Sequence, residues 1–480
     1  MEQATIQGIN VNKNELAGSL AVELTDEETL LTENLRHLFV RSQMTDFVKD
    51  PLVMARAEGM YYWDVHGKKY LDALSGIYTA SLGHSHPKIL LAIAEQMKQL
   101  HFSPVMHGTN PVAVRLAKRI IELAPGDLWA VKLLSGGSEA TEAAFKMARQ
   151  YHKLTGNATK YKIIARYQSW HGSTYGSLSA SGLTSRRTQS EPLTPGFVHV
   201  FPPTCYRCPF GKEYPTCQMT CATLIEDVIR GEGPETVAAI IVEPIGHTGG
   251  IIDPPDEYLP MLREMCDRHN VLLIFDEVIT GTGRTGELFA AETFGVTPDL
   301  LCLGKGMSGG YVPLSALICR KHIAEAFWGD SSTNPGFVEG HTFEGNPVSA
   351  ACGLAVLDEI VSNDLCGNAR KMGARLRAGL EDLRKYGVIG DIRGKGLFLG
   401  VEFVLDPATK EQFKVPIGQL IGKRGLQNGL LTRFDPHWMA FGPPLNVTAE
   451  QIDEILYLFE KSLVEVLATL QKYAIAPPGS

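Results

Sequence analysis

Four short runs of apolar residues stand in the middle of the chain, and none of them alternates with polar positions. They cover residues 162–165, 237–242, 271–275 and 300–303. A strand with one exposed face alternates apolar and polar side chains, whereas a strand buried on both faces is apolar throughout. The runs therefore predict strands in the interior of one parallel sheet.

A helical pattern separates the second run from the third. Between residues 256 and 270, apolar side chains recur at three- and four-residue spacing, at Tyr258, Met261, Leu262 and Met265. A strand, a helix and a strand in this order predict a βαβ crossover. The polar residues that close the runs are Glu243, Asp276 and Lys305, separated by 33 and 29 residues. We expect all three at the carboxyl edge of the sheet, where open α/β sheets bind ligands.

Both ends of the chain carry further elements. We expect a helix within residues 24–40, two short strands around the turn at His66-Gly67, and a glycine-rich loop followed by a helix after them. Beyond Gly345 the pattern predicts helices at 348–360 and 369–384, a few strands, and a final helix that opens with the capping box Thr448 to Gln451. A smaller C-terminal domain is expected.

Composition indicates a folded protein that acts on small molecules. The chain has 480 residues, 44% of them hydrophobic and 20% charged, with a mean hydropathy of −0.03. This length predicts two packed domains. The 45 basic and 53 acidic residues give a net charge of −8 without long runs of one sign. A nucleic-acid or acidic-membrane surface is therefore not indicated.

The sequence also indicates a compartment. No stretch approaches the roughly 20 apolar residues of a membrane span, and the N-terminus has no basic region followed by an apolar one. We expect a cytoplasmic protein, and in that reducing environment the nine cysteines are expected to be mostly free thiols.

Glycines and a serine directly precede one predicted helix. In the text LLSGGSEATEAAF, Gly136, Gly137 and Ser138 would present backbone N–H groups at the positive end of that helix. Such a site binds phosphate. An ordinary serine cap after a tight turn explains the same residues, so the motif by itself leaves both interpretations open.

Asp276 and Lys305 carry the chemistry that the sheet edge suggests. A carboxylate at the end of a buried strand requires a cationic or protonated partner, and a pyridinium nitrogen would be one. A partly desolvated lysine has a lowered pKa and becomes a Schiff-base nucleophile. A plain ion pair between the two residues is the alternative. Trp170, in the text WHG, could stack on a flat heterocycle or could be a core residue.

Six motifs in a fixed order are specific as a set: SGGSEA, WHG, IVEP, IFDEVITGTGRTG, LGKG and HTFEGNP. Together they resemble the class III pyridoxal-phosphate aminotransferases of fold type I over roughly residues 45–465. The resemblance implies an α/β fold with a large domain at residues 76–345, built on a mostly parallel sheet flanked by helices. A smaller α+β domain would comprise residues 346–480 together with the segment 1–75.

The resemblance also assigns roles to individual residues. Lys305 matches the lysine that forms the Schiff base with pyridoxal 5'-phosphate (PLP), and Asp276 matches the partner of its pyridine nitrogen. Both are the predicted catalytic residues. The other residues that match cofactor-binding positions are Gly137 and Ser138 (phosphate), Trp170 and Val278 (the two ring faces), His171, Glu243 (an acidic gate) and Thr342. Because Thr342 matches a threonine that reaches the neighbouring subunit's cofactor, a homodimer or a dimer of dimers with shared active sites is implied.

One departure from the family pattern concerns the substrate. Members that act on 4-aminobutyrate or ornithine carry an arginine before the FxPPL text, where this chain has Ala440. An arginine stands earlier instead, at Arg433, as in the ω-amine:pyruvate and taurine:pyruvate transaminases, and Tyr78 falls where those enzymes have an aromatic pocket residue. We therefore expect ping-pong transfer from an ω-amino acid or amine to a keto acid, with pyruvate favoured. Arg284 and Arg393 are the next candidates for the carboxylate-binding cation.

Several alternatives stay open. A 2-oxoglutarate enzyme of the 4-aminobutyrate type, an ammonia- or phospho-lyase and a racemase share the motifs, and the amine donor cannot be read from them. The GTGRTG text fits G-x-G-x-x-G but no helix opens on it, so a nicotinamide site is disfavoured. The sequence predicts no metal. Four thiols nevertheless cluster in one insert at zinc-like spacing, and a loop of reduced thiols is favoured over a metal site for Cys205, Cys208, Cys217 and Cys221.

Overall fold

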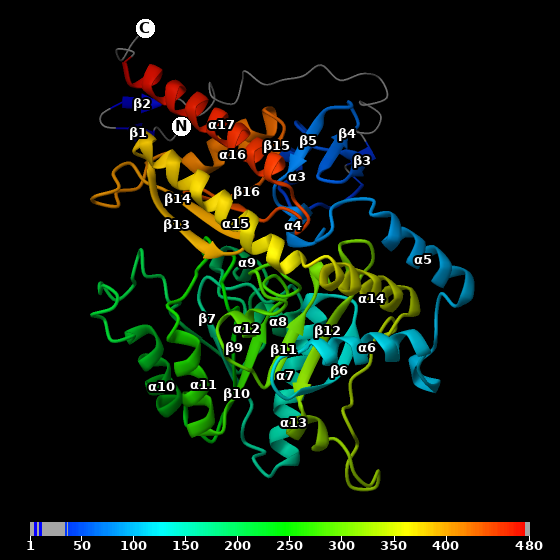
Figure 1. Ribbon diagram of the computed structural model, residues 1–480. Coiled ribbons are helices and arrows are strands. Elements are labelled where there is room, and N and C mark those ends of the chain that lie inside the picture. Colours follow the sequence, from blue (N-terminus) through cyan, green and yellow to red (C-terminus); the bar gives the residue numbers. More distant parts are fainter. Residues whose placement is uncertain (1–3, 7–8, 12–33, 36, 476–480) are drawn as a thin grey trace.

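The computed structural model describes residues 4–6, 9–11, 34–35 and 37–475. A seven-stranded sheet fills the lower half of the molecule as drawn in Figure 1, and two four-stranded sheets with helices α15, α16 and α17 fill the upper half. The helix predicted at residues 24–40 falls largely outside the described residues. No helix in the described part of the chain is long and apolar enough to cross a membrane.

The large sheet contains all four predicted strands. Its order is β6-β12-β11-β10-β9-β7-β8, and only β12 runs antiparallel to its neighbours. The bounds are β6 Leu128–Leu134, β7 Lys162–Arg166, β8 Phe197–Val200, β9 Val237–Val242, β10 Leu272–Asp276, β11 Leu300–Leu303 and β12 Ser315–Arg320. The α/β class with a mostly parallel sheet is confirmed.

Both faces of this sheet are buried, which explains the uninterrupted apolar runs. Successive side chains point to opposite faces, so Leu273 and Phe275 of β10 join one core cluster, and Leu272 and Ile274 join another. The first face is covered by α6 (Pro111–Leu123), α10 (Thr220–Glu232), α11 (Tyr258–His269) and part of α14 (Pro347–Ser362). The second is covered by α7 (Gly137–Leu154), α8 (Tyr175–Ala180) and α13 (Lys321–Glu325).

The two smaller sheets combine distant parts of the chain. One has the order β13-β14-β17-β16 and the other β15-β5-β4-β3, so that strands from near both chain ends share a sheet. Their bounds are β3 Met54–Glu58, β4 Tyr61–Asp64, β5 Lys69–Asp72, β13 Ile389–Lys395, β14 Phe398–Phe403, β15 Leu430–Leu431, β16 Arg433–Phe434 and β17 Trp438–Phe441. They pack with α5 (Pro87–Gln99), α15 (Leu365–Asp382), α16 (Ile417–Gln427) and α17 (Ala449–Ile475). The domain boundaries at 75 and 345 stay a prediction.

Capping residues decide where the C-terminal helices begin and end. The helix predicted at 369–384 begins earlier, at Leu365, because the Asp364 carboxylate accepts the Gly367 N–H at 3.1 Å. It ends earlier as well, since a 3₁₀ turn follows over Leu383–Tyr386. The predicted capping box of α17 is confirmed: the Gln451 side chain accepts the Thr448 N–H at 3.0 Å, and the Thr448 hydroxyl accepts the Gln451 N–H at 3.3 Å.

The remaining elements are short. They are β1 Ala4–Ile6, β2 Ile9–Val11, α3 Met44–Phe47, α4 Ser75–Tyr78, α9 Thr184–Arg187 and α12 Ala290–Thr293. Two further 3₁₀ turns cover Val105–His107 and Lys305–Ser308. The strands predicted around His66-Gly67 are β4 and β5, and the helix predicted after the glycine-rich loop is α5. The 3₁₀ turn at Lys305 directly follows β11, which places that lysine at the carboxyl edge of the large sheet.

Candidate functional site

A cavity of about 160 Å³ opens at the carboxyl edge of the large sheet. The residues that line it are Gly137, Ser138, Trp170, His171, Gly172, Glu243, Ile245, Asp276, Val278, Ile279, Thr280 and Lys305. Eight of the residues selected from the sequence therefore share one cavity, although they come from the ends of five different strands or their following loops.

The N-terminus of α7 forms one wall of the cavity. Its first N–H groups have no partners within the helix, and the helix dipole makes them attractive to an anion. Gly137 is required there, because an added Cβ would lie 2.9 Å from the Val278 Cγ1 atom. Gly172 has a φ of +144°, and its added Cβ would lie 2.5 Å from the Ser138 hydroxyl oxygen. The two glycines keep a hollow open beside the helix end.

Asp276 is held at the end of β10 by two polar contacts. Its side chain accepts the Val278 N–H at 3.1 Å through Oδ1, and its Oδ2 lies 2.7 Å from His171 Nδ1. Only 5% of its surface is exposed. The carboxylate is therefore fixed in position, and we assign the proton of this contact to His171 Nδ1, since a neutral imidazole can donate from that nitrogen.

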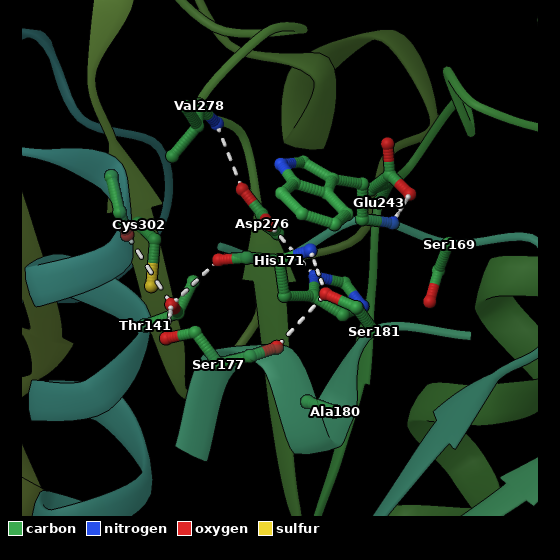
Figure 2. A network of polar contacts seen from close by, with 12 residues as sticks. Thr141, Ser169, His171, Ser177, Ala180, Ser181, Glu243, Asp276, Val278 and Cys302 are labelled. Atoms are coloured by element: carbon green, nitrogen blue, oxygen red, sulfur yellow. Dashed lines mark hydrogen bonds and ion pairs between the residues drawn. The ribbon is translucent and has the colours of Figure 1, made fainter. Parts of the chain in front are cut away.

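A hydrogen-bond network behind the cavity orients His171 in turn (Figure 2). The His171 N–H donates to the Ser181 hydroxyl at 2.8 Å, and the His171 carbonyl accepts the Thr141 hydroxyl at 2.8 Å. The Thr141 and Ser177 hydroxyls lie 2.6 Å apart, which joins α7 to α8. These three hydroxyl residues were not identified from the sequence, because single serines and threonines on separate segments carry no local signal.

Lys305 lies beyond the end of β11 in an unusual backbone conformation. Its φ is +42°, a region that costs free energy for residues other than glycine. Burial lowers the pKa of its amine, while the Asp276 and Glu243 carboxylates act in the opposite direction. Within the described part of the chain Lys305 forms no ion pair, so the plain Asp276–Lys305 pair is not found. A buried amine with a lowered pKa and no counter-ion is suited to nucleophilic attack.

Glu243 links two neighbouring segments of the cavity wall. Its Oε1 accepts the Trp170 N–H at 3.1 Å, and its Oε2 accepts the His247 N–H at 3.0 Å. Burial raises the pKa of this carboxyl group. Glu243 thus fixes the backbone of the residue whose indole lines the cavity, and it forms no ion pair with an arginine among the described residues.

Tyr78 and Arg433 lie outside the residues that line this cavity, on the side of the smaller sheets. Tyr78 is 1% exposed, has a φ of +60°, and its ring centroid lies 5.0 Å from that of His247 and 5.1 Å from that of Phe398. Burial lowers the pKa of His247, and the positive charges of Arg433 and Lys305 act in the same direction. His247 was not identified from the sequence, although it stands only four residues after Glu243.

Of the three candidate arginines, Arg433 is the one with a buried, unpartnered guanidinium nitrogen among the described residues. Its Nη2 atom pairs with Asp435 Oδ2 at 2.5 Å, and its Nε has no partner among the described residues. Arg284 is buried and donates to the Pro443 and Leu397 carbonyls. Arg393 pairs with Glu402 at 2.7 Å and also donates to the Gly250 carbonyl. These two arginines have structural roles.

Thr342 is not among the residues that line the cavity. It is exposed and stands in the loop before α14. The structure contains one chain, so the predicted contact with a neighbouring subunit stays a prediction.

The four cysteines of the insert are free, as are the other five, and all nine lie in the described part of the chain. Within the described residues, no three His, Cys, Asp or Glu side chains come together as metal ligands would. The four cysteines of the insert line a separate cavity together with Pro202, Pro209 and Phe210. Burial raises the pKa of Cys221 to about 11, so that this thiol is protonated near neutral pH.

Comparisons with known proteins agree on one family. The sequence model of that family, described as Aminotransferase class-III, matches residues 44–463. The chain is 36% identical to the adenosylmethionine-8-amino-7-oxononanoate aminotransferase of Geobacter sulfurreducens, over 91% of this chain and 98% of that protein. It is also 36% identical to the taurine–pyruvate aminotransferase of Bilophila wadsworthia, over 87% of this chain and 93% of that protein.

The solved structures give the same result. The ω-transaminase of Pseudomonas jessenii in complex with PMP superposes with a TM-score of 0.88 at 32% identity, over 93% of this chain and 99% of that chain. Because the identity exceeds 30% over nearly the whole length of each protein, both the fold and the family are shared.

Proposed function

The chain belongs to the class III aminotransferases, and from that premise we propose that it moves an amino group from an ω-amino acid or amine to pyruvate. Enzymes of this class use PLP as their cofactor. When bound, PLP supplies a conjugated ring that delocalises the electron pair left on the substrate carbon after proton removal. The proposal also names pyruvate as the acceptor and Lys305 and Asp276 as the catalytic residues. The geometry of the cavity and of the neighbouring strands supports both parts.

The cavity fits the cofactor in three respects. The hollow that Gly137 and Gly172 keep open beside the N-terminus of α7 suits a phosphate group. The fixed carboxylate of Asp276 suits a protonated ring nitrogen. Trp170 and Val278 both line the cavity, and they suit the two faces of a flat ring. A phosphate site, a carboxylate and a lysine in one cavity are the observation that carries the proposal.

Lys305 and Asp276 are the proposed catalytic residues. The Lys305 amine would hold the cofactor covalently and, once a substrate amine had taken its place there, would be free to move the proton of the substrate carbon. Its lowered pKa leaves more of the amine neutral, the form that attacks and accepts a proton. Asp276 would stabilise positive charge on the ring nitrogen, because His171 and the Val278 N–H hold its side chain in a fixed orientation.

The proposal of pyruvate as acceptor depends on Arg433. Arg433 and Ala440 are directly paired residues of the antiparallel strands β16 and β17. Side chains at such paired positions are neighbours on one face of the sheet. A guanidinium from β16 can therefore supply the positive charge that the buried Ala440 does not. We propose that Arg433 binds the carboxylate of the keto acid, with Tyr78 as a neighbouring wall of the substrate pocket.

We further propose that the enzyme acts in the cytoplasm as a homodimer or a dimer of dimers. The exposed position of Thr342, which is not among the residues that line the cavity of its own chain, supports a role at the cofactor phosphate of a neighbouring subunit. Sedimentation of the purified enzyme tests the assembly, and a monomer that retains full activity would refute the shared site.

An acceptor panel tests the proposed reaction. The enzyme is first converted to its amino form with an excess of 1-phenylethylamine or taurine, separated from the donor, and mixed with pyruvate or 2-oxoglutarate. We expect pyruvate to restore the starting absorbance faster than 2-oxoglutarate and to yield alanine. Preference for 2-oxoglutarate would favour the 4-aminobutyrate type. Release of ammonia would indicate a lyase, and inversion of the donor without transfer would indicate a racemase.

A further inference from the structure

Arg433 and Asp435 form an ion pair within one short strand and its turn. Arg433 begins β16, and Asp435 follows that strand directly. Residues two apart in a strand point to the same side, and the Arg433 Nη2 atom lies 2.5 Å from Asp435 Oδ2. The Asp435 N–H donates to the Trp438 carbonyl at 2.9 Å, which closes the turn between β16 and β17. The backbone therefore holds the two side chains together.

This ion pair uses only one edge of the guanidinium group. The Nε of Arg433 is buried and has no partner in the described part of the chain. The Cζ atom lies 5.6 Å from the centre of the Trp438 ring, so the group is supported on one side. A guanidinium binds a free carboxylate best through two parallel hydrogen bonds. A substrate carboxylate can therefore make a better contact with Arg433 than Asp435 does.

Asp435 is itself in an environment that favours its release. Burial raises the pKa of its carboxyl group. The charge of Arg433 lowers this pKa, and the charges of Arg186 and Arg41 lower it to a smaller extent. The side chains of Arg433 and Asp435 are 21% and 29% exposed, so water reaches the pair. When Asp435 leaves Arg433, its charge still has Arg186 and Arg41 nearby. Exchange of one carboxylate for another on Arg433 thus leaves no isolated buried charge.

We infer that Asp435 is a positioning residue that holds Arg433 in the absence of a substrate carboxylate and thereby lowers the affinity for the keto acid. This inference rests on the proposed role of Arg433 in binding the acceptor. An amine donor without a carboxylate leaves the ion pair intact, so that Arg433 does not enter the substrate pocket as an uncompensated charge. A keto acid must displace Asp435. Its apparent affinity is therefore its intrinsic affinity for Arg433 multiplied by the fraction of molecules in which Arg433 is free.

Propionate is a suitable probe, because it has the carboxylate and chain length of pyruvate and cannot accept an amino group. Its dissociation constant is measured calorimetrically with the PLP-loaded enzyme, so that turnover is not required. For Asp435→Asn we expect binding roughly two- to fivefold tighter than in the wild type, the range for loss of a partly exposed ion pair. The KM for pyruvate should fall by the same factor, with kcat within about twofold of the wild type.

Three further variants show how Asp435 acts. In Arg433→Ala, propionate should bind weakly, and adding Asp435→Asn should change nothing, because Asp435 acts through Arg433. Asp435→Glu should restore the wild-type affinity. The matched control is Asp453→Asn, which removes a similar ion pair between α15 and α17, where Arg375 Nη2 lies 2.7 Å from Asp453 Oδ2. The control should leave propionate binding unchanged, and thermal unfolding shows that each variant is folded.

Two results would overturn the inference. One is propionate affinity in Asp435→Asn that equals or falls below that of the wild type. The other is tighter binding in Asp435→Asn that persists without Arg433, since Asp435 would then only repel anions in general. Wild-type propionate affinity in Arg433→Ala would instead refute the proposed role of Arg433. Failure of pyruvate as an acceptor, with the propionate results as expected, would refute the proposed acceptor and leave the inference intact.

Discussion

Replacing Asp276 by asparagine removes one charge from the centre of the site and almost nothing else. The amide oxygen can still accept the Val278 N–H, now 3.1 Å from Oδ1. The amide nitrogen would face His171 Nδ1, now 2.7 Å from Oδ2, and the ring must then accept a hydrogen bond there instead of donating one. The backbone of His171 stays anchored by Thr141 and Ser181, so we expect the geometry of the site to survive.

The expected loss follows from the kind of contact removed. A charge-assisted hydrogen bond contributes about 1.5–3 kcal/mol, against about 0.5–1.5 kcal/mol for a neutral one. Replacing one charge-assisted hydrogen bond by a neutral one therefore slows the reaction about tenfold. Asp276 is 5% exposed, so its charge acts on the ring nitrogen with little screening by water. Removal of a preorganised charge in such a site typically slows the chemical step about 10²- to 10³-fold, and we expect this larger value.

The assay is the first half-reaction, followed by stopped-flow absorbance after mixing the PLP-loaded variant with an amine donor. Asp364→Asn is the matched control: Asp364 caps α15 outside the active-site cavity, and asparagine caps a helix as well as aspartate does. The control should react at the wild-type rate. A rate for Asp276→Asn within threefold of the wild type, with the cofactor still bound, would refute the assignment of Asp276 to the ring nitrogen.

Three further predictions address the acceptor, the phosphate end and the lysine. Arg433→Ala should cost about 2–3 kcal/mol in the pyruvate half-reaction and much less with a donor that lacks a carboxylate; equal losses in the two half-reactions would make Arg433 structural. Gly172→Ala should weaken PLP retention by about 1–3 kcal/mol, because its Cβ would lie 2.5 Å from the Ser138 hydroxyl at a φ of +144°. Gly231→Ala in α10, where an added Cβ contacts nothing within 4 Å, should retain PLP normally. The last prediction compares the free energy of unfolding of the cofactor-free wild type with that of Lys305→Met. Between the lowered pKa of Lys305 in the folded protein and its ordinary value of 10.5, the unfolded chain binds the proton more strongly, so the wild type should gain stability relative to the variant as the pH rises. Denaturant midpoints that change in parallel for the two proteins would contradict this.

Elements whose pattern is local were predictable from the sequence. The apolar runs identified β7, β9, β10 and β11, because strands buried on both faces leave no polar positions. Chain order then placed Asp276 and Lys305 at one edge, since parallel strands end together. The glycines before a predicted helix pointed to Gly137 and Ser138, and the WHG text pointed to Trp170. The family motifs then favoured a cofactor-binding role for these residues, and all three line the cavity.

Features that depend on contacts between distant segments were not predictable. His247 lies beside Tyr78 only because the loop after β9 meets the small sheets, and a single histidine after a strand carries no such information. The pairing of Arg433 with Ala440 requires the register of β16 and β17, each of which is too short for its pattern to specify a partner. The ion pair with Asp435 follows from the same turn. The sequence therefore identified the cofactor end of the site better than the substrate end.

The central claim is that the amino group itself moves from the donor to pyruvate. The most direct measurement uses a donor amine labelled with ¹⁵N in a single cycle: the enzyme is reacted with the donor, freed of it by gel filtration, and then given pyruvate. We expect one equivalent of ¹⁵N-labelled alanine for each active site and none for Lys305→Ala. Labelled ammonia without labelled alanine, or labelled alanine from Lys305→Ala at the wild-type rate, would contradict it.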